Sequence, residues 1–272
     1  MKSYFFKFLL LLFALSLLGC KKNSKNISSE KIAITENQIH YAKGFSIYQH
    51  QGFCIVKVTN PWPKANKEYT YILKEKNGIV PDSLRQFTTI QVPIQSIVVT
   101  STTHIPSLEM LGVENSLIGF PNLNYISSEK VRKRIEQKKI KELGNNQSLN
   151  TEILIDLQPE LIIGYGLDNN NLTLDNLQKS GLKVLLNGDW NEPTPLGKAE
   201  WIKLFGALYD KQKEAATIFS KIVNEYTKTV AIAKMATSTP TILAGDIFEG
   251  KWYLPSGTSW GSLLLKEAHS HY

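Results

Sequence analysis

The stretch Gln95–Asn122, QSIVVTSTTHIPSLEMLGVENSLIGFPN, decides the fold. Its apolar pattern predicts a strand over Ser96–Thr100, a polar loop, a helix that ends near Gly112, and a second strand over Ser116–Phe120. In an open α/β sheet, ligands bind at the loops that leave the carboxyl ends of such strands. The two loops of this unit are therefore expected to form a ligand-binding edge. Its residues are Ser101, Thr102, Thr103, His104, Pro121 and Asn122.

The alternation of strands and helices continues after this stretch. Asn150 or Thr151 caps a helix, TEILIDLQ, that ends before Pro159. The strand ELIIGYG follows, and a further helix, LTLDNLQKS, stops at Gly181 before the strand KVLLN. Strands that alternate with helices of this length predict a parallel sheet with both faces covered. We assign residues 95–198 to a first α/β lobe.

The segment before this lobe has the pattern of a β-rich extension. Between residues 32 and 94, two short runs, GFCIVKVT and EYTYILK, are separated by the turn-rich stretch NPWPKAN, which predicts a hairpin. Cys54 lies in the first run and is expected to be a buried apolar side chain. Trp62 lies between two prolines, where packing on its own turn is favoured over contact with a ligand.

A long helix and a further strand follow the first lobe. Apolar side chains recur at helical spacing, so residues 199–237 are predicted to form a linking helix, with a break near Asp210 left open. A helix of about 25 residues spans about 40 Å, enough to join two lobes. Residues 238–272 contain the strand TILAGDIF and are expected to start a second lobe. So short a segment cannot bury a sheet, so this lobe is expected to be incomplete in a longer protein.

The N-terminus has the pattern of a bacterial lipoprotein signal. Two lysines precede an apolar run over Phe8–Leu18, which is about half of the roughly 20 residues that span a bilayer. The residues Leu17–Cys20, LLGC, resemble a lipobox, which implies cleavage before Cys20 and attachment of lipid to its thiol. Residues 1–19 are therefore predicted to be a signal peptide, and residues 20–31 a lipidated, flexible tether. An ordinary signal peptide with an incidental cysteine is the alternative.

Composition and charge favour some classes of protein over others. The chain has 272 residues, 42% of them apolar, which indicates two folded lobes rather than a disordered chain. Its formal net charge is +7, or near +5 once Lys2 and Lys7 are removed with the signal peptide. The basic residues are spread out and form no stripe of the kind that binds nucleic acid.

The order and spacing of five segments resemble those of one protein family. The segments are the lipobox, STTHIPSLEMLGVENSLIGFPN, NTEILIDLQPELIIGYG, the long helix and KWYLPSGTSWGSLLLKEA. They resemble ABC-transporter periplasmic substrate-binding lipoproteins of the ferric-siderophore and cobalamin class. The resemblance implies an α/β fold of two Rossmann-like lobes joined by one long α-helix, with the ligand in the cleft between them. The second lobe would be truncated in this chain.

The resemblance also implies a set of functional residues. The ligand contacts would be Thr102, Thr103, His104, Pro121, Asn122, Tyr165 and Trp190 in the first lobe and Ser256, Ser259 and Trp260 in the second. Large aromatic side chains and hydroxyls suit a bulky ferric chelate, haem-like group or corrinoid, and no resident cofactor is expected. Glu152 matches the acidic residue that meets arginines of the membrane permease. A plain carboxylate at a helix start is the equal alternative.

The resemblance further implies partners, location and mechanism. The expected partners are an ABC permease dimer in the inner membrane, the small-molecule metal chelate and, through the lipid anchor, the membrane, with no nucleic acid. The expected location is extracytoplasmic and lipid-anchored, in the periplasm or at the cell surface. Capture between the lobes, a small hinge adjustment over the rigid helix and docking on the permease form the expected mechanism.

Three other functions fit the sequence less well. A zinc- or manganese-binding lipoprotein would use the histidines His104, His269 and His271. These lack the spacing of motifs such as CxxC or HExxH. An extracytoplasmic hydrolase would need a triad of Ser101 and His104 with Asp168 or Asp189, but Ser101 does not lie in a G-x-S-x-G elbow that would place it as a nucleophile, so the protein is predicted not to be an enzyme. A structural surface lipoprotein would bind no small ligand.

Overall fold

The computed structural model describes residues 35–146, 148–168 and 171–272. The chain divides into two compact units, Met1–Ala33 and Ile34–Tyr272, and all described residues belong to the second unit. The predicted signal peptide, the lipidated Cys20 and the tether lie outside the described residues.

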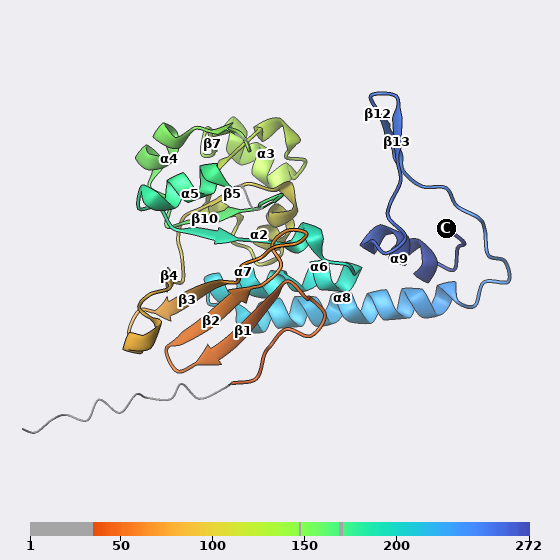
Figure 1. The fold of residues 1–272 in the computed structure, drawn as a ribbon, viewed down its shortest axis with the longest axis horizontal. Coiled ribbons are helices and arrows are strands. Elements are labelled where there is room, and N and C mark those ends of the chain that lie inside the picture. Colours follow the sequence, from red (N-terminus) through yellow and green to blue (C-terminus); the bar gives the residue numbers. More distant parts are fainter. Residues whose placement is uncertain (1–34, 147, 169–170) are drawn as a thin grey trace, which may run out of the picture. The chain divides into compact units, whose positions relative to one another are not determined.

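Short strands and helices alternate along most of the second unit (Figure 1). The strands are β1 (Phe45–His50), β2 (Phe53–Val58), β3 (Tyr69–Glu75), β4 (Thr88–Val92), β5 (Ile97–Val99), β6 (Leu117–Phe120), β7 (Lys141–Glu142), β8 (Gly144–Asn145), β9 (Ser148–Leu149), β10 (Leu161–Gly164), β11 (Val184–Leu186), β12 (Asp246–Phe248) and β13 (Lys251–Tyr253). The helices are α2 (Ile105–Met110), α3 (Glu129–Glu136), α4 (Thr151–Leu157), α5 (Leu172–Lys179), α6 (Pro195–Glu200), α7 (Ile202–Leu208), α8 (Gln212–Ala233) and α9 (Trp260–Glu267). Single 3₁₀ turns are η1 (Asp82–Leu84), η2 (Thr102–His104), η3 (Glu114–Ser116), η4 (Leu123–Tyr125) and η5 (Asp189–Asn191).

A five-stranded parallel sheet forms the centre of the α/β lobe, with strand order β11-β10-β5-β6-β7. The predicted strand–helix–strand unit of residues 95–122 is confirmed as β5, η2, α2 and β6. After β5 the chain adds β6 and β7 on one side, and later adds β10 and β11 on the other. The strand order therefore reverses between β5 and β10. In open α/β sheets, a crevice forms at this switch point, outside the carboxyl ends of the strands.

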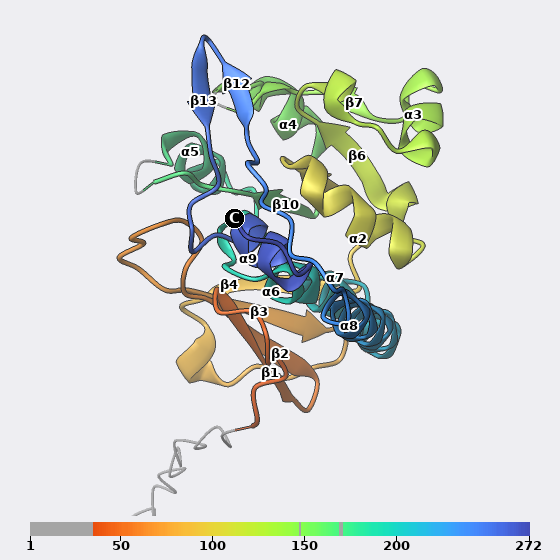
Figure 2. The ribbon, with the colours of Figure 1, turned by 90° about the vertical axis from the view of Figure 1, so that its right-hand side faces the viewer.

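Alternate side chains of the central strands enter two separate cores. Ile97 and Val99 of β5 lie in the first core with Ile163 of β10, whereas Val98 and Ile162 lie in the second. Successive side chains of a strand point to opposite faces, so both faces of the sheet are covered. Helices α2 and α7 supply side chains to the first core, and α4 and α5 to the second. Figure 2 shows α2 and α5 on either side of β10.

A four-stranded sheet precedes the parallel one, with order β1-β2-β3-β4. The predicted hairpin is confirmed, since β2 and β3 pair antiparallel, and β4 runs parallel to β3. Buried side chains of this sheet, among them Cys54 and Tyr71, enter the first core. The Tyr71 hydroxyl also accepts a hydrogen bond from the Leu186 N–H at 3.1 Å. Trp62 is buried in the second core.

Two buried glutamates hold the segment before β1. The Glu200 carboxylate accepts the backbone N–H groups of residues 40–42 at 2.6–3.1 Å and the Lys203 ammonium at 2.7 Å. The Glu192 carboxylate accepts the N–H groups of residues 43–44 at 2.8–3.1 Å. Hydrogen bonds to a charged group are stronger than those between neutral groups. The segment is therefore fastened to α6 and to the loop before it.

The predicted linking helix is divided into shorter helices. Helices α6 and α7 meet at Trp201, and α7 and α8 are separated at Asp210, where the sequence leaves a break open. Asp210 has a φ of 56°, which a right-handed helix does not allow. Helix α8 alone has 22 residues. Its first turns bury Ala215 and Phe219 in the first core, whereas its later turns are largely exposed.

The final residues 238–272 contain a hairpin and one helix. The predicted strand TILAGDIF is wrong over most of its length, since only Asp246–Phe248 forms β12, which pairs antiparallel with β13. Helix α9 contacts α6, and its Glu267 carboxylate accepts a hydrogen bond from the Tyr226 hydroxyl of α8. The start of a second lobe in these residues stays a prediction. No helix in the described part of the chain has both the length and the apolar character needed to span a bilayer.

Candidate functional site

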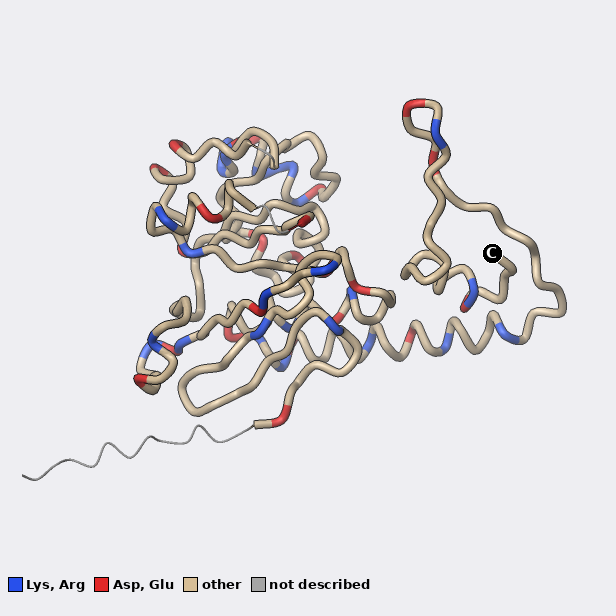
Figure 3. Tube along the Cα trace, viewed as in Figure 1, with Lys and Arg blue, Asp and Glu red and all other residues tan. Residues whose placement is uncertain are grey.

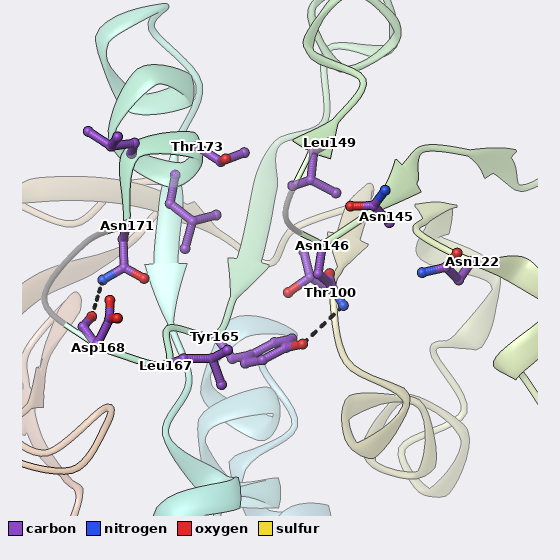
Figure 4. Close-up of a pocket in the computed structure, with 12 residues that line it drawn as sticks. Thr100, Asn122, Asn145, Asn146, Leu149, Tyr165, Leu167, Asp168, Asn171 and Thr173 are labelled. Carbon is purple, nitrogen blue, oxygen red and sulfur yellow. Dashed lines mark hydrogen bonds between the residues drawn. The ribbon is translucent and has the colours of Figure 1, made fainter. Parts of the chain in front are cut away.

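A polar pocket lies at the carboxyl edge of the parallel sheet, at the switch point between β5 and β10 (Figure 4). Its volume is about 510 Å³. Thr100 directly follows β5 and Tyr165 directly follows β10, so the strand ends themselves supply part of the lining. The lining residues are Thr100, Asn122, Asn145, Asn146, Leu149, Tyr165, Leu167, Asp168, Asn171, Leu172, Thr173 and Leu174. The crevice predicted from the strand order is therefore present.

The turn after β6 places Asn122 at the pocket. Its backbone is left-handed, with φ 55° and ψ 63°, a conformation that asparagine tolerates better than most residues. The Glu142 carboxylate of β7 accepts the N–H of Asn122 at 2.9 Å and the N–H of Leu123 at 3.0 Å. The turn is thus held by hydrogen bonds to its backbone, and the Asn122 side chain is left to line the pocket.

Gly164 allows the opposite wall to approach the sheet. A Cβ atom at this position would lie 2.8 Å from Cδ1 of Leu174, closer than real Cβ contacts allow. The absence of a side chain on Gly164 leaves room for the Leu174 side chain of α5 at the end of β10. Leu172, Thr173 and Leu174 of that helix therefore reach the pocket.

Two hydrogen bonds organise the lining (Figure 4). The Nδ2 atom of Asn146 donates to the Tyr165 hydroxyl at 3.1 Å, and the Nδ2 atom of Asn171 donates to the Asp168 carbonyl at 2.7 Å. The Oδ1 atom of Asn146 is buried and has no hydrogen-bond partner within the described residues. An unpaired buried acceptor is costly, and because this atom has almost no accessible surface, a ligand N–H or O–H group would satisfy it only after the Asn146 side chain turns toward the pocket.

The lining is polar but almost uncharged. Four asparagines supply amide groups that both donate and accept hydrogen bonds, and two threonines and Tyr165 add hydroxyls. Four leucines supply apolar contact. Asp168 is the one charged group of the described lining, which contains no lysine, arginine or histidine. Such a lining can hold a polar ligand through hydrogen bonds and van der Waals contact.

The structure brings two of the predicted ligand contacts together in this pocket, Asn122 and Tyr165. Thr102 and Thr103 are exposed in η2 and are not among the lining residues, and Pro121 is buried. The loop after β5 therefore contributes Thr100 in place of the residues expected from the sequence.

His104 does not face the crevice, which corrects the prediction. Its ring is 0% exposed and packs on the Phe205 ring, with 6.0 Å between ring centroids. Within the described residues neither ring nitrogen has a hydrogen-bond partner. Burial lowers the pKa of His104, and the nearby Asp189 charge acts in the opposite direction. The next residue, Ile105, is buried in the first core, so the start of α2 carries the histidine inward.

The remaining predicted contacts lie outside the pocket. Trp190 is half-buried and packs against the second core. Ser256 is exposed, and the Ser259 hydroxyl caps α9 by accepting the N–H three residues further on. The Trp260 ring centroid lies 5.2 Å from the Lys198 ammonium of α6. A role of these residues in ligand binding stays a prediction.

Glu152 is exposed in the first turn of α4. The helix is capped by Asn150, as predicted, whose Oδ1 atom accepts the Ile153 N–H at 3.0 Å. In the part of the chain that the structure describes, the Glu152 carboxylate has no hydrogen bond or ion pair. Its position at a helix start suits the favourable dipole interaction, and its carboxylate remains open to a partner.

The described residues form neither the metal site of the zinc- or manganese-binding alternative nor the catalytic triad of the hydrolase alternative. Across the described ranges, no group of three or more His, Cys, Asp and Glu side chains is arranged to hold a metal ion. The Ser101 hydroxyl shares a 2.9 Å hydrogen bond with the Thr103 hydroxyl, and within the described residues it has no hydrogen bond to His104. His104 has no hydrogen-bond partner within those ranges, so the proposed triad does not form.

Sequence reasoning missed most of the amide side chains of the pocket, Asn145, Asn146 and Asn171. A usable signal was present in the runs NNQ, from residue 145, and NNN, from residue 169. The first run follows β7 and the second follows β10, two strands of one parallel sheet. Two amide-rich loops that leave the same sheet edge indicate a polar pocket.

Sequence comparison identifies relatives of this chain. A family model described as periplasmic binding protein matches residues 97–270. The uncharacterized lipoprotein MJ0878 of Methanocaldococcus jannaschii is 24% identical over 267 residues, which cover 88% of this chain and 63% of that protein. The uncharacterized lipoprotein MJ0872 of the same organism is also 24% identical, over 76% of this chain and 53% of that protein. The chain thus spans 53–63% of the length of these relatives.

Solved structures share the fold at low sequence identity. A periplasmic binding protein from Veillonella parvula has a TM-score of 0.58 and 14% identity, over 86% of this chain and 67% of that chain. The periplasmic haem-binding protein HutB of Vibrio cholerae has a TM-score of 0.53 and 16% identity, over 65% of each chain. The siderophore-binding protein BauB has a TM-score of 0.52 and 16% identity, over 67% of this chain and 63% of that chain. The family match covers more than half of the chain, so this protein belongs to the periplasmic binding protein family, in agreement with the resemblance drawn from its sequence.

Proposed function

We propose that this protein is the substrate-binding component of an ABC importer and carries a metal chelate to a membrane permease. The cargo is a ferric siderophore or a haem-like or corrinoid ligand. The pocket at the switch point, with its volume of about 510 Å³, carries the proposal. Small-molecule sites usually enclose about 300–1,000 Å³. HutB, named as haem-binding, and BauB, described with ferric acinetobactin, share the fold and support the choice of cargo.

The lining suits capture without covalent chemistry. The Tyr165 ring and the four leucines offer apolar area to a flat or bulky ligand. The asparagines provide hydrogen bonds that depend on the orientation of the ligand. The proposal also includes a second set of ligand contacts, which would cover the bound ligand. These are Ser256, Ser259 and Trp260.

Delivery to the permease is assigned to Glu152. Its exposed carboxylate, without a partner among the described residues, suits a charge-assisted bond with an arginine of the permease. Membership of the periplasmic binding protein family supports a location outside the cytoplasm. A lipid anchor on Cys20 would keep it close to the membrane that holds the permease, and the lipoprotein names of two relatives support this part of the proposal.

Binding of candidate cargoes tests the first part of the proposal. Purified full-length chain is titrated with ferric siderophores, haem and cobalamin, while the fluorescence of the tryptophans and the heat of binding are recorded. We expect saturable binding with one ligand per chain for at least one class. An Asn146→Leu substitution should weaken that binding about tenfold, since it removes the hydrogen-bonding amide and keeps a similar volume. Absence of saturable binding in all three classes would refute the cargo assignment.

Transport tests the role of Glu152. A Glu152→Ala substitution should reduce uptake of the cargo by cells that express the cognate permease and leave binding to the purified protein unchanged. Asp156→Ala is the matched control, because Asp156 is an exposed carboxylate on the same helix. Loss of ligand binding in Glu152→Ala, or equal uptake in the two variants, would contradict a docking role.

A further inference from the structure

We propose that the pocket selects uncharged or cationic chelates that bear amide, hydroxyl or ammonium groups, and that it rejects polyanionic ones. This inference rests on the proposed function and adds the charge class of the cargo. It is drawn from the chemistry of the lining residues that the structure describes, among which the Asp168 carboxylate is the one charged group and every other donor and acceptor is neutral.

The absence of cations extends beyond the lining to the whole of the loops that build it. Residues 143–151, LGNNQSLNT, contain no charged side chain. Residues 161–178 contain two aspartates, Asp168 and Asp175, and no lysine or arginine. A rearrangement of either loop would therefore bring no positive charge to the ligand. A polyanion would lose its hydration there without gaining an ionic partner, which strongly disfavours its transfer.

The two arginines of the most basic helix in the lobe are already engaged. Lysines and arginines are spread along the described trace (Figure 3). In the most basic helix, α3, the Arg132 guanidinium donates to the Leu123 carbonyl at 3.1 Å. The Arg134 guanidinium donates to the side chain and carbonyl of Asn115 and to the Leu117 carbonyl at 2.8–2.9 Å. These contacts hold both arginines on α3 in structural roles.

The neutral groups of the pocket favour a ligand that brings donors. The Oδ1 atom of Asn146 is a buried acceptor without a partner in the described residues. A ligand N–H or O–H group would satisfy it once the Asn146 side chain turns toward the pocket, whereas a carboxylate or catecholate oxygen would repel it. Amide side chains also pair with ligand amides, because each offers one acceptor and two donor hydrogens. A corrinoid with peripheral amides and a hydroxamate chelate with hydroxyl or ammonium groups both fit this description.

A panel of probes that differ in charge tests the inference on the full-length chain. The probes are cyanocobalamin and ferrichrome, which are neutral overall, ferrioxamine B, which is cationic, and ferric enterobactin and haemin, which are anionic. Isothermal titration calorimetry at low and at physiological salt gives each affinity. We expect the tightest neutral or cationic probe to bind at least tenfold more tightly than either anionic probe. Preferred binding of an anionic probe would overturn the charge selection alone. Failure of every probe would overturn the proposed function and the selection with it.

A charge introduced into the lining tests whether the charge of the pocket, and not its shape, decides which chelate binds. Leu172→Lys places a cation at an exposed lining position, and Ile232→Lys is the matched control, an exposed apolar residue of α8 outside the pocket. Leu172→Lys should raise the affinity for ferric enterobactin about tenfold and lower that for ferrioxamine B by a similar factor, with both effects weaker at high salt. Equal affinities in Leu172→Lys and Ile232→Lys for both probes would overturn the inference.

Discussion

The amide group of Asn146 donates a hydrogen bond to the Tyr165 hydroxyl at 3.1 Å and so joins two loops of the pocket that leave different strands of the parallel sheet. The bond restrains the aromatic ring that directly follows β10. It also leaves the Oδ1 atom of Asn146 without a partner among the described residues. One side chain therefore orients the main aromatic surface of the pocket and carries a buried acceptor that a rotation of the side chain would present to the ligand.

Removal of the Tyr165 hydroxyl should weaken ligand binding while the fold is kept. Tyr165→Phe retains the ring but loses a hydrogen bond worth about 1 kcal/mol, so the dissociation constant of the bound chelate should rise about fivefold. Calorimetric titration measures this change. Tyr125→Phe is the control, because Tyr125 is 72% exposed and does not line the pocket. Equal affinities of the two variants would show that the hydroxyl plays no part.

Glu200 should contribute strongly to stability through the backbone donors that it binds. Glu200→Gln keeps the shape but turns a charged acceptor into an amide whose NH₂ group faces N–H donors and Lys203. We expect the free energy of unfolding to fall by about 2–4 kcal/mol, measured by urea denaturation. Glu214→Gln, on the exposed surface of α8, should change it little. A Glu200 variant as stable as this control would contradict the proposed anchoring.

The stabilisation by Glu200 should also depend on pH. Burial alone would raise the pKa of this carboxyl, but hydrogen bonds from Lys203 and from the N–H groups of residues 40–42 outweigh it and lower the pKa below the ordinary 4.5. A carboxyl with a lowered pKa in the folded state stabilises the fold above pH 4.5, and this stabilisation is lost as the pH falls through the lowered value. The stability difference between the wild type and Glu200→Gln should thus be full at pH 7 and shrink below pH 4.5. A difference that grows in acid would refute this assignment.

Cys54 should be unreactive in the folded protein. Burial raises the pKa of its thiol to about 12, and the negative charge of Glu75 acts in the same direction. Because the thiolate is the reactive form, a thiol reagent at pH 8 should label Cys54 only when the protein unfolds. The measurement uses a Cys20→Ser variant, so that Cys54 is the one thiol in the chain. Labelling in native buffer as fast as in urea would show that the thiol is accessible.

The order of strands and helices could be predicted from the sequence because local patterns determine it. The apolar runs around Ile97 and Ile162 predict buried strands, and Asn150 and Gly181 mark helix ends through capping chemistry that involves only near neighbours. The sequence does not decide whether the helix breaks at Asp210, because a single residue with positive φ has no clear sequence signal. The buried Glu200 was missed because its partners lie about 160 residues away in the chain.

The position of the candidate site could be predicted, but only part of its lining could. The carboxyl ends of the strands follow from the parallel order, and Asn122 and Tyr165 lie there as expected. The direction of each side chain depends on tertiary packing, which no local pattern contains. His104 has the polar character of a binding residue, yet the buried start of α2 carries it into the core. Asn146 lies in a polar loop of ordinary composition. Only the folding of that loop brings its amide group to the Tyr165 hydroxyl in the pocket.

His104 should be replaceable without loss of ligand binding. Its two ring nitrogens are buried and unpaired within the described residues, so His104→Leu removes a desolvation cost and should leave the stability at pH 7 unchanged or raise it by about 1 kcal/mol. Burial lowers the pKa of His104 in the folded state, against the opposing effect of Asp189, so the unfolded state takes up more protons below pH 6.5 and the wild type loses stability there. The variant should therefore lose less stability than the wild type between pH 7 and pH 5, as measured by urea denaturation at both values.

Titration with the chelate at pH 7 should give the same affinity for both proteins. A tenfold weaker affinity of His104→Leu, at unchanged stability, would instead show that the histidine reaches the ligand, as its place in the STTH loop first suggested.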